Sequence, residues 1–438
     1  MRDFTFGTID EHTFDEFSAR HPQGNFQQTS RMAAVHRADG AHVSLLGVRE
    51  AGTLVAATTL DVHKGRLSTF AEIHDGPLCD LHDRELTTFL FDNLRAYARK
   101  EGAAQLSITP EVVWQVRDSL GCALPTSEDA PWPAFVPEGV PTGCDQASFD
   151  TLTSCGFLHE GFDQEYNAIP RWRYVKDLTG ITSEKDLLAT YAKNTKRNVR
   201  IAETSAVEVT RATREELSVF HDICELSCEK QGFDNRPLPY FELLYDKLGD
   251  DAVFHIAYID AAAYLKSWED KRDGFLADVH RLERLIEAAK DTGKTDKNEK
   301  KLADVQSKYE ASLNRVETAR SYLEEDGARI PAAAALFVYH PHECVYLFSG
   351  SNPKYAKFYA ATAIQHHVMC TCLEHGITRY NFYGINGVFD DPDDPGRGLL
   401  EFKQGFSGYV EEMMGSFTLP VKPATYALKQ LAHKVLKR

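Results

Sequence analysis

A lysine between aromatic residues near the end of the chain has a side chain that could do chemistry. Lys403 lies in the segment EFKQGF, after the acidic, proline-broken DDPDD and between Phe402 and Phe406. An ammonium group that such neighbours partly desolvate can stabilise negative charge on oxygen, as on the tetrahedral intermediate of an acyl transfer. The alternative is a surface lysine at a strand edge. The segment by itself leaves both interpretations open.

A stripe of basic residues could bind phosphates. The segment YAKNTKRNVRIAE places four cations at three- and four-residue steps, which puts them along one side of a helix. They are Lys193, Lys196, Arg197 and Arg200. The whole chain has a formal net charge of -16, which argues against a protein coated in basic charge for nucleic acid. The stripe is therefore either a local contact for a polyanion or an ordinary solvated helix face.

A third candidate lies in the segment RPLPYF, where Arg236 and Tyr240 are four residues apart around two prolines. Arginine binds a phosphate with two parallel hydrogen bonds, and a tyrosine hydroxyl can donate one more. The pair therefore indicates a candidate anion site.

We predict no metal site and no cofactor. His366 and His367 are adjacent on a predicted helix and point apart, whereas chelation favours a spacing of four. DDPDD lacks the glycine and the spacing of a calcium loop. The sequence also contains no P-loop and no GxSxG motif.

The elements that must position these residues read as a repeated α/β pattern. In each half of the chain, predicted strands precede a helix, a glycine and a further strand. The segments are 41–62, 84–102 and 103–110, then 252–260, 330–340, 343–350, 354–376 and 377–384. Strands interrupted by helices favour mixed or parallel sheets, and the repeated order suggests a duplicated unit.

Residues 263–326 have a different character. Apolar residues recur there at alternating steps of three and four on both sides of a turn, DTGKTDKN. This pattern predicts an antiparallel helical hairpin closed along a heptad seam. Predicted strands flank it, so it is an insertion. It is either a solvated coiled coil or an arm that contacts a large partner.

Eight segments occur in an order that resembles one family. They are NFQQTS, DGPLCD, KNTKRNVR, RPLPYF, SGSNPKYAKFYAATAIQ, RYNFYGINGVF, FKQGFSG and YALKQL. Together with the inserted hairpin, they resemble the Fem family of aminoacyltransferases, and its FemA type in particular, over nearly the whole chain. The resemblance implies an α/β (α+β) fold with two GNAT-like subdomains and an inserted antiparallel coiled-coil hairpin.

The resemblance also implies domain bounds. Subdomain A covers 1–165, subdomain B covers 166–262 and 327–438, and the coiled-coil arm covers 263–326. The C-terminal strands are allowed to return to subdomain A.

The function that the resemblance implies is tRNA-dependent aminoacyl transfer. Such an enzyme moves an amino acid from an aminoacyl-tRNA to the stem-peptide side-chain amine of a peptidoglycan precursor, or to the growing interpeptide bridge. The acceptor is lipid II or UDP-MurNAc-pentapeptide, and other Fem-type proteins are candidate partners. Two alternatives are a GNAT-like acyl-CoA N-acyltransferase, for which we find no clear pyrophosphate loop, and a non-enzymatic cell-wall scaffold that uses the coiled coil.

The family pattern gives roles to single residues. Arg236 matches an arginine that binds the precursor's phosphates, and Tyr240 matches the tyrosine beside it. Lys403 matches a lysine at the acyl-transfer centre, and Phe402 supplies the adjoining peptide bond. Tyr346 matches an aromatic residue that lines the precursor groove.

Three positions depart from the family pattern. His36 stands where relatives often have a phosphate-binding lysine, and Phe348 stands where one relative has a second groove tyrosine. Thr109 replaces a common aspartate, which weakens a mechanism with a carboxylate base. We therefore expect the substrate's own groups to take the proton of the attacking amine.

The expected location is cytoplasmic. The N-terminal MRDFTFGTIDEHTF is acidic and lacks the apolar core of a signal peptide, and no apolar run is long enough to span a bilayer. The basic segment KPATYALKQLAHKVLKR is either an ordinary terminal helix or a weak peripheral contact with anionic lipid at the inner face of the membrane.

Overall fold

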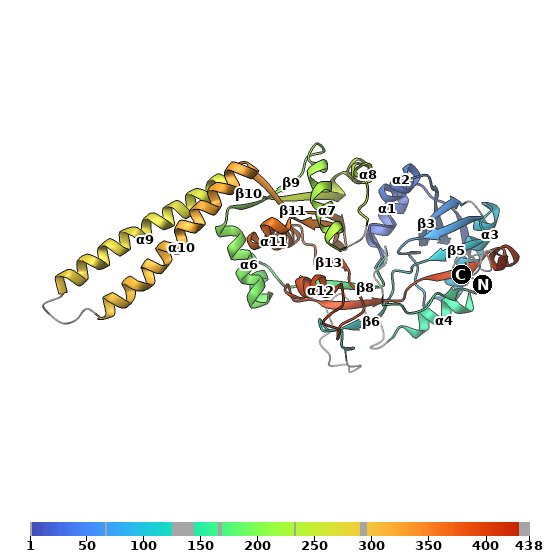
Figure 1. Ribbon diagram of the computed structural model, residues 1–438. Helices are drawn as coiled ribbons and strands as arrows, with labels where there is room; N and C mark the ends of the chain where they lie inside the picture. Colours follow the sequence, from blue (N-terminus) through green and yellow to red (C-terminus); the bar gives the residue numbers. More distant parts are fainter. Residues whose placement is uncertain are drawn as a thin grey trace.

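The protein has two β-sheets, each covered by helices, and a long helical hairpin that projects from one of them (Figure 1). The structure is a computed structural model, which describes residues 2–65, 68–124, 144–164, 169–231, 234–289 and 296–428. Within these residues, no helix combines the length and the hydropathy needed to cross a membrane. The last ten residues of the basic C-terminal segment lie outside the described residues, so its contact with lipid stays a prediction.

The first sheet has seven strands and lies in the half of the molecule that contains the chain's start. Its strand order is β1 (Phe4–Thr8), β2 (His42–Glu50), β3 (Thr53–Lys64), β4 (Thr69–Ile73), β5 (Gln105–Ile108), β15 (Phe417–Pro420) and β7 (Leu158–His159). Its helices are α1 (Glu11–Arg20), α2 (Ser30–Ala38), α3 (Arg84–Lys100) and α4 (Gln146–Ser154). Helix α3 begins at Asp83, whose side chain accepts a hydrogen bond from the Leu86 amide. Its apolar face is buried in the core, as the spacing predicts.

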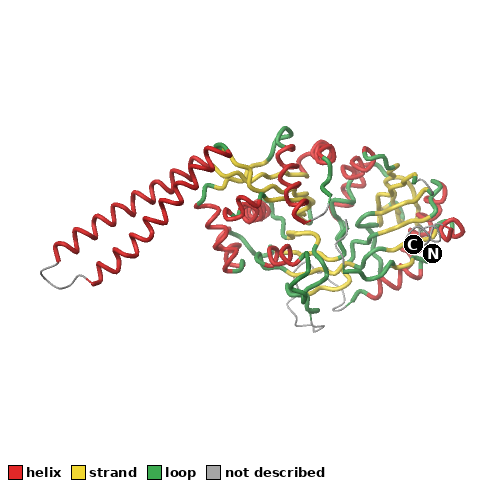
Figure 2. The backbone as a smooth tube through the Cα atoms, viewed as in Figure 1, coloured by secondary structure: helices red, strands yellow, loops and turns green. Residues whose placement is uncertain are grey.

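The second sheet has eight strands and packs helices on both faces (Figure 2). Its strand order is β6 (Val113–Arg117), β14 (Tyr409–Met413), β8 (Trp172–Asp177), β13 (Arg379–Gly384), β12 (Glu343–Ser351), β11 (Arg329–His340), β10 (Ala252–Asp260) and β9 (Val207–Arg211). Its helices are α5 (Glu184–Thr190), α6 (Lys193–Thr204), α7 (Leu217–Gln231), α8 (Leu238–Leu248), α11 (Ala360–Glu374) and α12 (Arg397–Gln404), with the 3₁₀ turns η1 (Gly249–Asp251) and η3 (Pro353–Phe358).

The two halves exchange strands. Strand β6 lies between β5 and β7 of the first sheet in the chain but pairs with β14 in the second sheet. Strand β15 follows β14 of the second sheet in the chain but pairs with β5 and β7 in the first. The mixed α/β class with two subdomains is confirmed. The bounds of the subdomains stay a prediction.

The predicted hairpin is present as α9 (Ala261–Ala289) and α10 (Asp296–Asp326). It is inserted between β10 and β11, two paired antiparallel strands in which Asp260 is opposite Arg329. Val279 and Leu282 on one helix, and Val316 and Ala319 on the other, are buried, in agreement with the heptad seam. Residues 290–295 of the connection lie outside the described residues.

Candidate functional site

Lys403 is a buried cation bonded to the backbone. It lies in α12 with 2% of its surface exposed, so the alternative of a surface lysine is wrong. Its Nζ donates to the carbonyl oxygens of Phe382 at 2.7 Å and Gly384 at 2.5 Å, and more weakly to that of Tyr383 at 3.4 Å. Burial lowers the pKa of Lys403 to about 7. Only the ammonium form has three N–H groups for three carbonyls, so these contacts favour the charged state.

The carbonyls that Lys403 binds belong to a strained turn at the end of β13. Tyr383 has a φ of 61°, in the left-handed region, which costs a non-glycine residue about 1–3 kcal/mol. The Tyr383 amide donates to Oδ1 of Asn381 at 2.8 Å, and Nδ2 of Asn381 donates to Glu343 at 3.0 Å. Lys403 and Asn381 thus hold this turn from two sides.

Aromatic rings surround the turn on one side of the sheet. Phe402, next to Lys403, packs edge-on against Phe406 at 5.4 Å, and Phe406 lies 5.4 Å from Phe382. Tyr346 in β12 meets Phe382 edge-on at 6.3 Å and stacks on Phe337 at 5.4 Å. The structure therefore brings Tyr346 and Phe402 into one apolar cluster around the Lys403 turn.

Arg236, Tyr240 and Phe348 form a second group. The Arg236 guanidinium lies 5.2 Å from the centre of the Tyr240 ring, and Tyr240 meets Phe348 edge-on at 6.1 Å. Burial raises the pKa of the Tyr240 hydroxyl. Arg236 is exposed, and no carboxylate of the described residues forms an ion pair with it. The guanidinium is therefore available to an anion from solution.

A β-bulge separates Tyr346 from Phe348. The register between β11 and β12 shifts at Leu336 and Phe337, so that Tyr346 is opposite Phe337 while Phe348 is opposite Leu336. The bulge turns Phe348 to the face that carries α7 and α8. Tyr383, held by Lys403, packs in the same apolar cluster as Tyr240 and Phe348. This shared cluster connects the Lys403 turn to the Arg236 group.

His36 lies on α2, a helix that packs against α8 of this second group. It is in the last turn of α2, and its ring pairs with the buried carboxylate of Asp61 in β3. Helix α2 packs on α8, since Arg31 donates to the Leu248 carbonyl and to Asp251, both at 2.7 Å. His36 is therefore on the helix that supports the Tyr240 helix.

A buried charge cluster joins the two sheets, and no sequence pattern indicates it. Arg173 in β8 of the second sheet donates to Asp75 at 2.9 Å and to Glu111 at 2.7 Å, which follow β4 and β5 of the first sheet. The guanidinium also lies 5.7 Å from the Tyr383 ring centre. Thr109 has a structural part here, because its hydroxyl accepts from the Asp75 amide at 2.9 Å. These partners are far apart in the chain, so no local motif marks them.

The cluster contains a carboxylate with an unusual pKa. Burial raises the pKa of Glu111 to about 7, and the nearby Asp75 adds to the rise, although Arg173 acts in the opposite direction. Sequence reasoning found no carboxylate base near Thr109 and did not consider Glu111. Both of its carboxylate oxygens accept from Nη1 of Arg173 while Nη2 donates to Asp75, which favours a structural role in joining the sheets.

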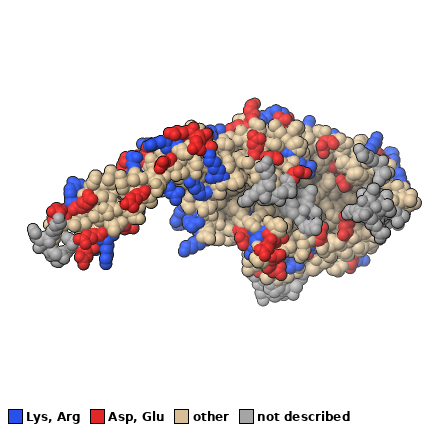
Figure 3. Space-filling model, in the orientation of Figure 1, with Lys and Arg blue, Asp and Glu red and all other residues tan. Residues whose placement is uncertain are grey.

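The predicted basic stripe lies on α6. Lys193, Arg197 and Arg200 are exposed, and Lys196 donates to the Ala189 carbonyl at 2.7 Å. Figure 3 shows lysine and arginine side chains gathered over α6, beneath the base of the hairpin.

The η3 turn extends this basic surface towards the hairpin. Arg197 lies 3.4 Å from the Tyr359 hydroxyl, just after η3, and Lys354 of η3 pairs with Asp326 of α10 at 2.7 Å. Lys357 lies 4.9 Å from the ring centre of Tyr322 on α10. The stripe and the hairpin base thus form one surface.

Comparison with known proteins agrees with this architecture. The family model for the FemAB family matches residues 9–434. The chain is 27% identical over 441 residues to aminoacyltransferase FemA of Staphylococcus aureus, strain bovine RF122 / ET3-1, with 99% of each chain covered. The FemA of strain N315 gives the same identity and coverage. A crystal structure of FemX has a TM-score of 0.76 at 22% identity, covering 97% of this chain and 99% of FemX.

The fold is therefore the FemX fold, two α/β subdomains with an inserted helical arm. The chain belongs to the FemAB family, which confirms the predicted resemblance.

Proposed function

We propose that this chain is a tRNA-dependent aminoacyltransferase that adds an amino acid to the stem-peptide amine, or to the growing bridge, of a peptidoglycan precursor. Its FemAB membership and its FemA relatives confirm the transferase class. One observation carries the rest of the proposal. The turn held by Lys403 shares an apolar cluster with Tyr240 and Phe348, beside the exposed Arg236.

The acceptor would bind at the Arg236 group. Lipid II and UDP-MurNAc-pentapeptide both carry a diphosphate, and an exposed guanidinium beside a tyrosine hydroxyl suits that anion. Phe348 is proposed to line the path of the precursor, and Tyr346, buried in the cluster on the other side of the bulge, to support that path from behind.

Replacing Arg236 with alanine tests the acceptor site. We expect the KM for UDP-MurNAc-pentapeptide to rise about 10- to 100-fold with little change in kcat, because a charged hydrogen bond to phosphate contributes about 1.5–3 kcal/mol. Steady-state kinetics at saturating aminoacyl-tRNA measure this effect. Arg214→Ala is the matched control, since Arg214 is already paired with Asp246 at 2.9 Å. An unchanged KM in the Arg236 variant would reject the site.

The donor would bind on the surface formed by α6, η3 and the hairpin. An aminoacyl-tRNA is a polyanion, and the stripe of Lys193, Lys196, Arg197 and Arg200 is a local basic surface on an acidic protein. The stripe also lies beside an arm long enough to contact a large partner.

Charge reversal of the stripe tests the donor surface. We expect Lys193→Glu with Arg200→Glu to raise the KM for aminoacyl-tRNA at least about 10-fold and to flatten its dependence on salt, because fewer counterions are released on binding. Arg84→Glu with Lys100→Glu makes the same change in charge on α3 of the other lobe, where both residues are exposed. Equal effects of the two double variants would show that net charge alone is responsible.

The proposed reaction is direct attack. The acceptor amine, after losing a proton, attacks the ester carbonyl of the aminoacyl-tRNA, and an amide bond forms as the ester C–O bond breaks. The leaving ribose oxygen takes up a proton. Alignment of the two substrates supplies much of the acceleration. We propose that Lys403, with Phe402 beside it, stabilises the developing oxyanion in two ways. Its positive charge lies behind the turn, and its hydrogen bonds fix the position of the turn.

A further inference from the structure

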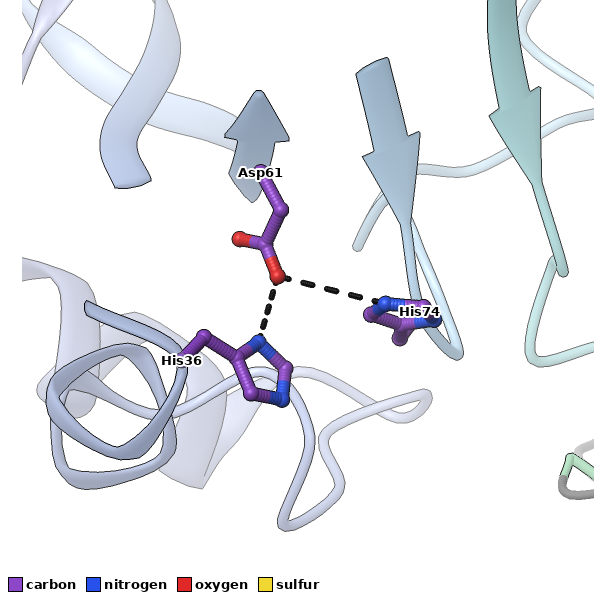
Figure 4. A group of neighbouring side chains, drawn as sticks. All are labelled: His36, Asp61 and His74. Carbon is purple, nitrogen blue, oxygen red and sulfur yellow. Dashed lines mark ion pairs between the residues drawn. The ribbon is translucent and has the colours of Figure 1, made fainter. Parts of the chain in front are cut away.

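Three side chains from separate segments converge beside α2. His36 comes from α2, Asp61 from β3, and His74 directly follows β4. Figure 4 shows both imidazole rings directed at the same carboxylate of Asp61. The histidine and carboxylate atoms that could act as ligands all lie within 4.8 Å of one another. His74 Nε2 is 3.9 Å from Asp61 Oδ2, and His36 Nδ1 is closer still.

Among the described residues, the ion-pair partners of this carboxylate are histidines. Asp61 is 1% exposed, and its Oδ2 faces His36 Nδ1 and His74 Nε2. Glu72 is directly opposite Asp61 in the β3–β4 pair, and its Oε2 lies 3.8 Å from His74 Nε2. Like charges opposite each other on adjacent strands are destabilising, and burying a carboxylate is costly. A bound cation would remove both costs.

We propose that His36, Asp61 and His74 bind a divalent transition-metal ion, with Zn²⁺ as the ion that fits the donor set best. Two imidazoles and one carboxylate are ligands typical of zinc. Zinc–ligand distances of about 2.0–2.2 Å place tetrahedral ligand atoms about 3.3–3.5 Å apart, so His74 has to approach Asp61 while the closer His36–Asp61 contact opens. His36 and His74 keep 18% and 26% of their side-chain surface exposed, so both rings have room to move and the ion a path to enter.

Three protein ligands leave one position for an exchangeable group, as in catalytic zinc sites. Resting on the proposed function, we assign that position to a phosphate oxygen of the acceptor, because α2 packs on α8, which carries Tyr240. The metal would then supply, next to Arg236, a second positive charge for the diphosphate.

A second cluster in the described residues is a weaker candidate. Glu184, Glu203 and His366 also bring ligand atoms together, but both carboxylates are exposed. His366 already has a partner on each ring nitrogen, the Tyr191 hydroxyl at 3.2 Å and Glu184 at 3.3 Å. This cluster serves as the control.

Calorimetric titration of the full chain, stripped with EDTA, with Zn²⁺ tests the site. We expect one ion per chain with a Kd of about 1 µM or tighter. His74→Gln and Asp61→Asn should each weaken binding about 100-fold, whereas His366→Gln should not. Co²⁺ in place of Zn²⁺ should give the visible absorption of a site with nitrogen and oxygen ligands. Equal Zn²⁺ affinity in wild type and in His36→Gln/His74→Gln would overturn the proposal.

Two further measurements keep the test decisive. If a variant fails to fold, the Tm of the wild type still tests for binding, because a ligand that binds only the folded state raises the Tm. A wild-type Tm that did not rise with Zn²⁺ would contradict the proposal. Binding of inorganic pyrophosphate should be at least 10-fold tighter with Zn²⁺ than without. Equal pyrophosphate affinity would overturn the phosphate assignment. Zn²⁺ binding in a chain without transfer activity would instead count against the proposed function.

Discussion

Lys403→Met will lower the rate of aminoacyl transfer about 10²-fold or more, mainly in kcat, because small displacements of groups that align substrates carry costs of that size. Methionine has a similar length but no N–H groups. The carbonyls of Phe382, Tyr383 and Gly384 lose their donor, and the left-handed turn at Tyr383 loses its support. Single-turnover kinetics with both substrates saturating measure the effect. A wild-type rate in a folded Lys403 variant would refute the assignment.

A matched control separates catalytic support from general stability. Lys176 is also a buried lysine that donates to backbone, at 2.9 Å to Phe406 and 3.1 Å to Ser407. Burial lowers its pKa to about 8. Lys176→Met should cost a similar free energy of unfolding, about 2 kcal/mol, because it also leaves buried carbonyls without a donor. We expect its kcat to stay within about threefold of wild type, which is less than 1 kcal/mol in the barrier. Equal losses of kcat in the two variants would make Lys403 merely structural.

Arg173→Met will have the largest effect on stability. It leaves Asp75 and Glu111 buried at the junction of the two sheets without their cation, and breaking a buried pair in this way costs about 3–5 kcal/mol. Urea denaturation at pH 7.5 measures the free energy of unfolding. Arg214→Met is the control, because Arg214 pairs with two carboxylates at the surface and exposed pairs contribute about 0–1 kcal/mol. A loss below that of the control would contradict the role of Arg173.

The loss in the Arg173 variant should shrink at low pH. Burial raises the pKa of Glu111 from 4.5 to about 7. Between these values the folded chain holds more protons at this group than the unfolded chain, so its contribution to stability rises as pH falls. Without Arg173, which lowers the pKa of Glu111, this dependence becomes steeper. If the free energy of unfolding of the variant did not recover between pH 7.5 and pH 5, the unpaired carboxylates would not be the cause of its lower stability.

The sequence predicts well what local patterns encode. The hairpin follows from the heptad spacing, because seam residues such as Val279 and Val316 must face a partner helix. The α3 helix follows from the spacing of its apolar face and from Gly102 after it. The exchange of β6 and β15 between the sheets has no local signal, since pairing partners depend on the whole fold.

The sequence predicts which residues belong to the candidate site better than it predicts their arrangement in space. Lys403 stood out by its aromatic neighbours, but the carbonyls that it binds belong to another segment, so its burial could not be inferred. Tyr346 and Phe348 are two residues apart and should share a face, yet the bulge separates them. The carboxylates that Arg173 binds lie in the other lobe, and pairs of that kind leave no periodic trace in a sequence.

The insertion point of the hairpin has a consequence for its reach. Because Asp260 and Arg329 are opposite each other in one ladder, the chain leaves and re-enters the sheet at a single place. The 29 residues of α9 extend about 43 Å, and one heptad added to each helix would lengthen the arm by about 10 Å without altering any strand pairing. The length of the arm can therefore change independently of the rest of the fold, and on the proposed function it could be matched to the size of the donor.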